Sequence, residues 1–363
     1  MRGLLTGQKA YSTPLYLNID ATHRCNLHCP YCRWHSPLLP KTILDKNIEP
    51  DLSPELFRGL CKDLSGTGTQ TLMFVGAGEP LMHPQIYDLI NTAKSFGFRV
   101  ILYSNGLRLD AATAQSLIAT RLDLLRVTLG DTSAEGFEQK HPQVKSGTFQ
   151  HILEGLKHVS RIKQDRGTTA PQLELGVPID SHILADLDKI INIATATGCN
   201  GLFFSVVLDF GEEALKPFCL SPEEVATACR ILPQKRDLLE ALSIRHNIDE
   251  VLLRYKIGRK VWKRVPCYSA WYYSFIRSDG KVLVCQRSEA PMGDLKQNRF
   301  AEIWNNESYN NFRRSALNDP NPPYDCEYCP HIVNNHRIHR YFRWLLPLVM
   351  ISNGQFRLRS FSD

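Results

Sequence analysis

The 363-residue chain has no secretory signal sequence and no apolar stretch long enough to cross a bilayer. These absences argue against an exported or membrane-spanning protein. A formal net charge of +6 is small for this length, so the overall charge does not indicate a nucleic-acid partner. Apolar residues make up 43% of the chain, which is enough to bury the core of one large domain, or of a large and a small one.

Cysteine, by contrast, is frequent, with eleven residues in the chain. In a chain without a secretory signal, this number indicates the reducing cytoplasm, where thiols stay available for metal. The odd count also favours metal clusters over disulfides. We therefore expect a cytoplasmic metalloprotein.

Three of the cysteines, Cys25, Cys29 and Cys32, are separated by a four-residue step and a three-residue step. This spacing lets one loop place three thiolates around an iron–sulfur cluster and leaves the fourth iron without a protein ligand. A structural zinc site is normally closed by four ligands, whereas a catalytic metal keeps one position free. A zinc site or a disulfide loop is the alternative interpretation, and His23 and His28 are candidate zinc ligands.

Short apolar runs alternate with longer amphipathic stretches as far as about residue 207, which is typical of βα units around a parallel sheet. Strands are predicted at residues 15–20, 71–75, 99–103, 124–129, 173–178 and 201–207. Helices are predicted between them at residues 54–64, 84–96, 111–120, 149–164 and 184–197, with Ser53, Thr148 and Ser181 as capping residues, and a further helix is predicted at residues 237–255.

The cysteine pattern, with Tyr31 as the aromatic residue before the last cysteine, resembles the motif of the radical S-adenosylmethionine (SAM) superfamily. In that family, the amino and carboxylate groups of SAM chelate the open iron of a [4Fe-4S] cluster. The reduced cluster cleaves SAM to methionine and a 5'-deoxyadenosyl radical, which abstracts a substrate hydrogen. The resemblance implies an α/β fold, a partial (βα)6 parallel barrel, with the cluster loop after the first strand.

Glycine and polar residues follow the next three predicted strands, where parallel barrels carry their functional groups. The run 76–80 is similar to the family's Gly-Gly-Glu motif, and the run 104–106 is similar to its Thr-Asn-Gly turn, although Asn-Gly is also a common turn in its own right. Relatives carry a SAM-contacting serine and an arginine at the places of Thr128 and Lys145. The resemblance therefore implies a SAM-binding set of Tyr31, Gly76, Gly78, Glu79, Ser104, Asn105, Thr128 and Lys145.

Four later cysteines, Cys267, Cys285, Cys326 and Cys329, form a second set. A predicted β-hairpin at residues 275–285 returns the second of them towards the first. Four thiolates complete the ligand shell of a [4Fe-4S] cluster and are equally suited to zinc. The spacing around Gly280 resembles the auxiliary-cluster domain of SPASM and twitch radical SAM enzymes. Because no cysteine follows the set, the resemblance implies the twitch variant, with one auxiliary [4Fe-4S] cluster.

The predicted organisation is a radical SAM partial-barrel domain at residues 1–235 and a twitch-type domain with a β-hairpin and a helix at residues 236–332. A tail follows at residues 333–363, in which Arg337 and Arg340 precede a short apolar run. Such a segment either docks on the enzyme's own body or lies at a lipid interface, and we expect docking.

The predicted reaction is hydrogen abstraction that leads to oxidation (dehydrogenation) of a small metabolite, with the auxiliary cluster accepting an electron. Basic residues between Arg254 and Arg264 favour an anionic substrate. The segment before residue 15 is too short for the peptide-recognition domain that many peptide-modifying relatives carry, so a small molecule is preferred over a peptide. Peptide maturation, redox-neutral epimerisation or rearrangement, and a non-catalytic iron–sulfur or nucleic-acid-binding role are the alternatives.

The catalytic base is unknown at this stage, because Asp131, Asp180 and Asp279 all lie in suitable loops and no pattern distinguishes one of them. The expected protein partner is an electron donor such as flavodoxin or ferredoxin. Neither a nucleic acid nor a membrane is an expected partner.

Overall fold

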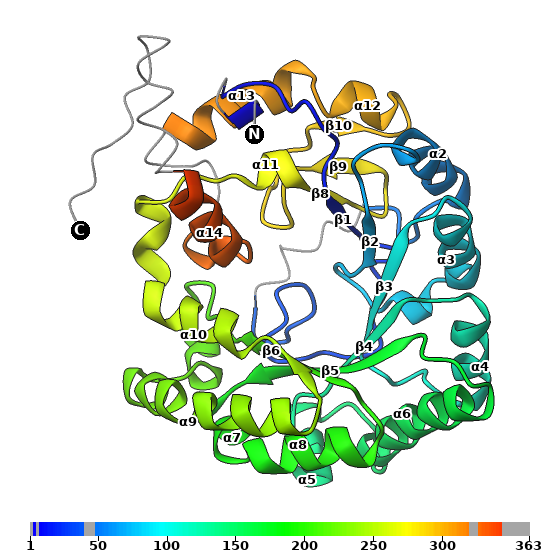
Figure 1. Ribbon diagram of the computed structural model, residues 1–363, viewed down its shortest axis with the longest axis vertical. Helices are drawn as coiled ribbons and strands as arrows, with labels where there is room; N and C mark the ends of the chain where they lie inside the picture. The colour runs from blue at the N-terminus through cyan, green and yellow to red at the C-terminus, as the bar shows by residue number, and fades with distance from the viewer. Residues whose placement is uncertain (1–2, 5–6, 40–47, 319–325, 343–363) are drawn as a thin grey trace.

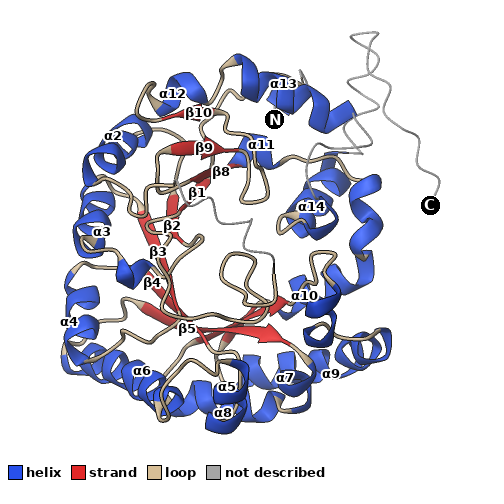
Figure 2. Cartoon of the chain, turned by 180° about the vertical axis from the view of Figure 1, so that it is seen from behind, coloured by secondary structure: helices blue, strands red, loops and turns tan. Residues whose placement is uncertain are grey.

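The computed structural model describes residues 3–4, 7–39, 48–318 and 326–342. Within this part of the chain, ten strands form one continuous sheet in the order β10-β9-β8-β1-β2-β3-β4-β5-β6-β7. The sheet curves around the middle of the molecule, and helices cover its outer side (Figure 1). Figure 2 shows the same arrangement from behind, with the strands inside and the helices outside.

The first six strands pair in parallel and in sequence order, which confirms the predicted incomplete (βα)6 barrel. They are β1 (Tyr16–Ile19), β2 (Thr71–Phe74), β3 (Arg99–Ser104), β4 (Leu124–Thr128), β5 (Gln172–Ile179) and β6 (Gly201–Val206). The helices among them are α2 (Pro54–Leu64), α3 (Ile86–Ser95), α4 (Ala111–Ala119), α5 (Ala134–Lys140), α6 (Thr148–Asp165), α7 (Ser181–Ala185) and α8 (Leu187–Ala196).

Helix α2 illustrates how the sequence builds this layer. The side chain of Ser53 accepts hydrogen bonds from the first backbone N–H groups, as predicted, and a proline occupies the first turn. Phe57, Leu60, Cys61 and Leu64 then recur at helical spacing and are all buried. One face of the helix is therefore apolar and packs against the sheet.

Three local predictions were wrong. The residues that cap α6 and α7 are Gly147 and Asp180, each one position before the predicted cap. The predicted helix at 184–197 is two helices, which meet at Asp186. The predicted helix at 237–255 is the end of α9 (Pro222–Ala241), a short strand β7 (Arg245–His246) and α10 (Ile248–Ile257), because Ser243 turns the chain with φ of 56° and β7 pairs with β6.

The later part of the chain joins the same sheet. Strand β8 (Tyr273–Ile276) pairs in parallel with β1, and β9 (Lys281–Leu283) returns antiparallel to it, so the predicted hairpin is present. Gly280 takes the turn with φ of 86°, a backbone conformation that favours glycine. Strand β10 (Gly293–Asp294) forms the edge. The hairpin between Cys267 and Cys285 thus pairs directly with β1, the strand that leads to the first set of cysteines.

The remaining elements complete this end of the molecule. They are the helices α11 (Ser269–Tyr272), α12 (Phe300–Ile303), α13 (Glu307–Asn318) and α14 (Ile332–Phe342), and the short 3-10 helices η2 (Pro80–Met82), η3 (Glu213–Phe218), η4 (Arg259–Lys263) and η5 (Cys326–Tyr328).

Helix α14 holds the described part of the predicted tail against the body. The side-chain oxygen of its buried residue Asn335 accepts hydrogen bonds from the backbone N–H of Tyr268 and the hydroxyl of Tyr272. Arg337 forms an ion pair with Glu250 of α10 at 2.7 Å. The apolar run of the tail lies at residues 343–363, outside the described residues. Among the helices that are described, none has the length and apolar character needed to cross a membrane.

Candidate functional site

The first three cysteines line one cavity at the carboxyl end of the first strands. Strand β1 ends at Ile19, and the loop that follows brings Cys25, Cys29 and Cys32 together in this cavity with free thiols. Burial raises the pKa of the Cys25 thiol to about 11. Burial, with the neighbouring thiols Cys32 and Cys25, raises the pKa of Cys29 well above its usual value. Three converging thiols of this kind ionise readily only when a metal binds them, so the donor set fits a metal cluster.

The structure brings most of the proposed SAM-binding residues to the same cavity. Its lining includes Tyr31 from the cysteine loop, the segment 76–80 after β2, Ser104 and Asn105 at the end of β3, and Thr128 at the end of β4. Lys145 is the exception, because it lines a separate cavity at the start of α6 together with Asn26 and His151. The roles of these residues in SAM binding stay predictions, and the geometry favours the set without Lys145.

Glu79 joins the loops after β2 and β3. Its buried carboxylate accepts hydrogen bonds from the backbone N–H of Leu81 at 3.0 Å, the hydroxyl of Ser104 at 2.9 Å and the backbone N–H of Asn105 at 2.6 Å. Burial raises the pKa of this carboxyl, while the same three hydrogen bonds oppose the rise. Glu79 therefore sets the relative positions of two loops that line the cavity.

We expect Glu79→Gln to lower the free energy of unfolding by about 1–3 kcal/mol, because an amide offers one acceptor where three donors converge and leaves buried groups unpaired. Urea denaturation of the protein before cluster reconstitution measures the effect. Glu289→Gln is the matched control, because Glu289 is exposed. Equal stability of the two variants would show that the hydrogen bonds of Glu79 do not hold the loops.

Gly76 and Gly78 let the loop after β2 press against the chain that leads to the cysteines. A Cβ on Gly78 would lie 2.2 Å from the carbonyl oxygen of Thr22 and 2.4 Å from that of Arg24. A Cβ on Gly76 would lie 2.2 Å from the carboxylate of Asp20. The backbone N–H of Glu79 also donates to the carbonyl of Arg24 at 2.8 Å. The two glycines are thus needed for close packing of two loops.

Gly78→Ala is expected to lower stability by roughly 1–3 kcal/mol or more, because backbone atoms cannot yield as a flexible side chain can. It should also displace the cysteine loop, so the reconstituted variant should retain less iron. Gly59→Ala is the control: Gly59 lies in α2 and a Cβ there meets nothing within 4 Å, so this change should stabilise by about 0.5–1 kcal/mol. Thermal unfolding and iron content report both effects, and a Gly78→Ala variant with normal stability and iron would contradict the packing argument.

Sequence reasoning missed several residues of the cavity. Gly130, Phe137 and His141 line the cavity, yet no sequence motif identified them as site residues. A Cβ on Gly130 would lie 2.3 Å from the hydroxyl of Tyr31, so the absence of a side chain makes room for that ring. Asn26 accepts a hydrogen bond from Asn105 at 2.7 Å, which links the cysteine loop to the loop after β3. Its position directly after a cysteine was the available signal.

The three candidate bases are all engaged in ion pairs. Lys140 lies 2.9 Å from Asp131 and 2.5 Å from Asp180, and all three side chains are almost fully buried. Burial alone would raise the pKa of Asp131, but the hydrogen bond and charge of Lys140 lower it. Asp279 pairs with Arg277 in the hairpin turn at 2.5 Å. These carboxylates stabilise loops, and none is positioned as a free base.

The second set of cysteines converges beside the β8–β9 hairpin. Burial raises the pKa of Cys285 to about 12, and the nearby thiol of Cys267 adds to the effect. Burial also raises the pKa of Cys329 well above its usual value, and Cys267, Cys285 and Cys326 raise it further. All four are free thiols. Among the described residues, no group of three or more His, Cys, Asp or Glu is arranged to hold a single metal ion.

At the first site, the structure does not favour His23 and His28 as zinc ligands. The imidazole of His23 lies 2.6 Å from the carboxylate of Asp20, which is buried at the end of β1. The ring of His28 lies 6.2 Å from that of His35. Neither histidine lines the cavity that the three thiols share.

Comparison with protein families finds two matches. Residues 19–171 match the radical SAM superfamily, and residues 267–330 match SPASM, described as an iron–sulfur cluster-binding domain. The matches cover the barrel strands up to the start of β5 and the region of the second cysteine set.

Curated relatives are similar over most of their length. A PqqA peptide cyclase from Streptomyces rochei is 25% identical over 332 residues, covering 88% of this chain and 83% of that protein. An AdoMet-dependent heme synthase from Methanosarcina barkeri is 22% identical over 327 residues, covering 85% and 86%.

Solved structures share the fold. Streptococcus suis SuiB bound to its precursor peptide SuiA aligns with a TM-score of 0.64 at 11% identity, covering 84% of this chain and 68% of that chain. The protein anSMEcpe with bound AdoMet aligns with a TM-score of 0.61 at 15% identity, covering 94% and 100%.

Proposed function

Because the chain belongs to the radical SAM superfamily and carries a SPASM iron–sulfur cluster-binding domain, we propose that it uses a SAM-derived radical to modify a peptide. The observation that carries the radical chemistry is the convergence of three free thiols with the strand-end residues in one cavity. The peptide substrate is inferred from the curated peptide cyclases that resemble this chain over most of its length.

The residues present fit the two cofactors that the family implies. Cys25, Cys29 and Cys32 would hold a [4Fe-4S] cluster, which when reduced supplies the electron that splits SAM into methionine and a 5'-deoxyadenosyl radical. The loop edge that Gly76 and Gly78 shape would contact SAM, and Glu79 keeps that edge in register with the next loop.

The second cysteine set would hold one auxiliary [4Fe-4S] cluster through Cys267, Cys285, Cys326 and Cys329. Its attachment to β1 through β8 would fix its position relative to the first site. We propose an oxidative outcome, in which the substrate would lose a hydrogen atom to the radical, one further electron to the auxiliary site and a proton to solvent as the new bond forms. An electron donor of the flavodoxin or ferredoxin type would supply the electron that starts each cycle.

Oxidation of a small metabolite is the second candidate. The similarity to an AdoMet-dependent heme synthase supports a substrate other than a peptide. Because peptide cyclases recur among the curated relatives, the peptide is the preferred substrate class.

The test is anaerobic reconstitution with iron and sulfide, followed by reduction in the presence of SAM. We expect 5'-deoxyadenosine and methionine in equal amounts, at a low rate without substrate. Short peptides encoded beside the gene are then added one at a time, and the matching peptide should raise the rate and lose hydrogen by mass spectrometry. Intact clusters that never cleave SAM would refute the enzyme proposal, whereas SAM cleavage without any modified peptide would favour the second candidate.

A further inference from the structure

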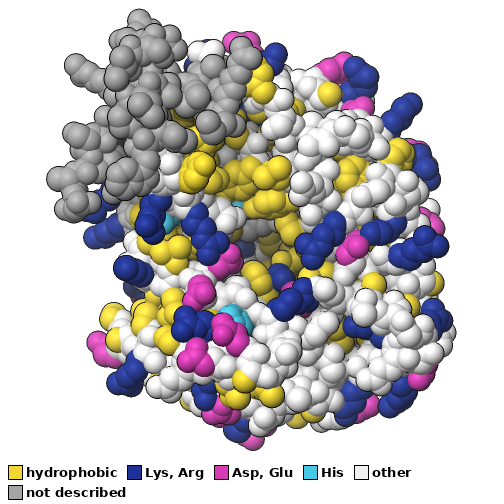
Figure 3. Space-filling model, viewed as in Figure 1, with side chains coloured by type: hydrophobic (Ala, Val, Ile, Leu, Met, Phe, Trp, Pro, Cys, Tyr) yellow, Lys and Arg dark blue, Asp and Glu magenta, His cyan; other side chains and the backbone are white. Residues whose placement is uncertain are grey.

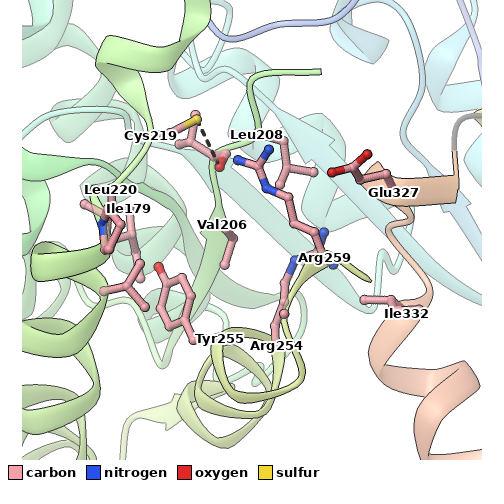
Figure 4. Close-up of a pocket in the computed structure, with 14 residues that line it drawn as sticks. Ile179, Val206, Leu208, Cys219, Leu220, Arg254, Tyr255, Arg259, Glu327 and Ile332 are labelled. Atoms are coloured by element: carbon pink, nitrogen blue, oxygen red, sulfur yellow. Dashed lines mark hydrogen bonds between the residues drawn. The ribbon is translucent and has the colours of Figure 1, made fainter. Parts of the chain in front are cut away.

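A second cavity of about 450 Å³ lies where β5 and β6 end against α9, α10 and the auxiliary cysteine loop (Figure 4). Most of its wall is aliphatic. A cavity of this volume is typical of a small-molecule or side-chain binding site. The aliphatic residues of its lining are Ile179, Val206, Val207, Leu208, Leu220, Val225 and Ile332.

Two arginines project into this cavity from the same side (Figure 4). The guanidinium of Arg259 is neutralised by Asp209, with contacts of 3.0 Å to both carboxylate oxygens. Arg254 differs, because one of its nitrogens donates to the backbone carbonyl of Cys329 at 3.0 Å and no carboxylate within the described chain forms an ion pair with it. The charge of Arg254 is therefore uncompensated by the described protein groups.

The environment makes that charge unfavourable in the free protein. The Arg254 side chain is half-buried, so its guanidinium has lost part of its surrounding water while it stays charged at neutral pH. The other charged group of the lining, Glu327, is exposed at the rim, so solvent screens it. A ligand with a carboxylate would replace the missing water and anion at Arg254.

We propose that this cavity binds an apolar side chain of the substrate together with a neighbouring carboxylate, and that Arg254 is the residue that recognises the carboxylate. The inference rests on the proposed peptide function and names the substrate feature that this chain selects: a bulky apolar residue next to a carboxylate group. Arginine suits the task because its planar fork can bind a carboxylate with two hydrogen bonds while a third nitrogen keeps its contact with Cys329.

The cavity lies beside the second set of cysteines. Arg254 contacts the backbone of an auxiliary cysteine, and Ile332 lies three residues after that cysteine. A substrate residue in this cavity is thus held beside the second set of thiols. The face in Figure 3 is hollowed near its centre, and both basic and acidic side chains lie around the hollow.

The competing explanation is that Arg254 serves only as a counter-charge for an auxiliary cluster. The two explanations differ in what the cavity does. A counter-charge requires no ligand in the cavity, and filling the cavity would then have no effect on binding of a peptide. A recognition site requires that affinity depend both on the carboxylate and on the free space.

The experiment measures binding of two probes to the reconstituted full chain by anaerobic calorimetry. The probes are N-acetyl-Leu-Phe as the free acid and the same dipeptide as its carboxamide, which lacks the negative charge. We expect the acid to bind at least about tenfold more tightly, in line with a charge-assisted hydrogen-bonded pair. Arg254→Gln should abolish this preference and leave the carboxamide affinity nearly unchanged. Arg264→Gln is the matched control outside the lining, and it should keep the preference.

Val225→Trp supplies a second, independent arm, because Val225 lies in the second turn of α9 and faces the cavity. The indole should fill the space and weaken both probes by tenfold or more, while iron content stays at the wild-type value. Equal affinity of acid and carboxamide for the wild type, an unchanged preference in Arg254→Gln, or normal binding to Val225→Trp would each overturn the proposal. SAM cleavage without substrate is measured in parallel. Wild-type protein that does not cleave SAM would refute the proposed function. Wild-type protein that cleaves SAM but does not bind the probes would refute only this inference.

Discussion

Cys29→Ala is expected to remove about four of about eight irons per chain and to reduce 5'-deoxyadenosine formation to background. Cys29 is the middle one of the three proposed ligands, and a cluster that already lacks a fourth protein ligand would not be held firmly by two. The loss should be local, because none of the eleven cysteines forms a disulfide and the thiol lies in a loop outside the strands. Iron and sulfide analysis, electron paramagnetic resonance of the reduced protein and quantification of 5'-deoxyadenosine are the measurements.

Cys229→Ala is the control for this experiment. Cys229 is exposed on α9 and has no neighbouring cysteine at a ligand spacing, so its removal should change neither iron content nor SAM cleavage. A Cys29→Ala protein that still bound about eight irons and produced 5'-deoxyadenosine would show that the triad does not hold the SAM-binding cluster. Zinc in place of iron at this site would support the alternative interpretation of the loop.

Cys329→Ala is expected to differ from Cys29→Ala in its effect on SAM cleavage. It should also remove about four irons, but substrate-free cleavage of SAM should continue, because the cavity of Cys25, Cys29 and Cys32 does not include it. Formation of an oxidised product should cease. Cys329 is a suitable choice because Cys267, Cys285 and Cys326 all lie near enough to raise the pKa of its thiol.

The measurement pairs metal analysis with product analysis on the same sample, and Cys229→Ala again provides the control. A variant that kept about eight irons would mean that Cys329 is not a ligand. Wild-type protein with zinc and only about four irons, together with a Cys329→Ala variant that lacks this zinc, would identify the second set as a zinc site. The auxiliary cluster would then have no part in the mechanism. Loss of substrate-free SAM cleavage would show that the two sites are not independent.

Local features of the sequence were sufficient for the barrel. The strands β1 to β6 begin within one residue of their predicted starts, because alternating apolar runs and helical periodicity are short-range patterns. The errors are of a different kind. The turn at Ser243 that splits a predicted helix accompanies the pairing of β7 with β6, a long-range contact that no local pattern encodes. The cap of α6 at Gly147 lies one residue before its predicted position.

The site shows the same division. Motif spacing identified the triad and the loops after β2 and β3, since each motif follows directly from a strand that could be predicted. It assigned Lys145 to the SAM-binding set, whereas Lys145 lines a separate cavity at the start of α6. The position of a loop residue that follows another helix depends on packing, which motif spacing does not describe. Motif spacing also gave no indication that Gly78 packs on the carbonyls of Thr22 and Arg24.

The sequence alone determined the order of the strands and the family and predicted the cysteine donors, because cysteine spacing and apolar periodicity are properties of neighbours along the chain. Tertiary structure alone decided that β8 extends the sheet beside β1, that the two cysteine sets are held by one framework, and that Arg254 reaches a largely aliphatic cavity without forming an ion pair with any described carboxylate. These contacts join residues hundreds of positions apart, and their energies come from burial and backbone pairing, which no single segment contains.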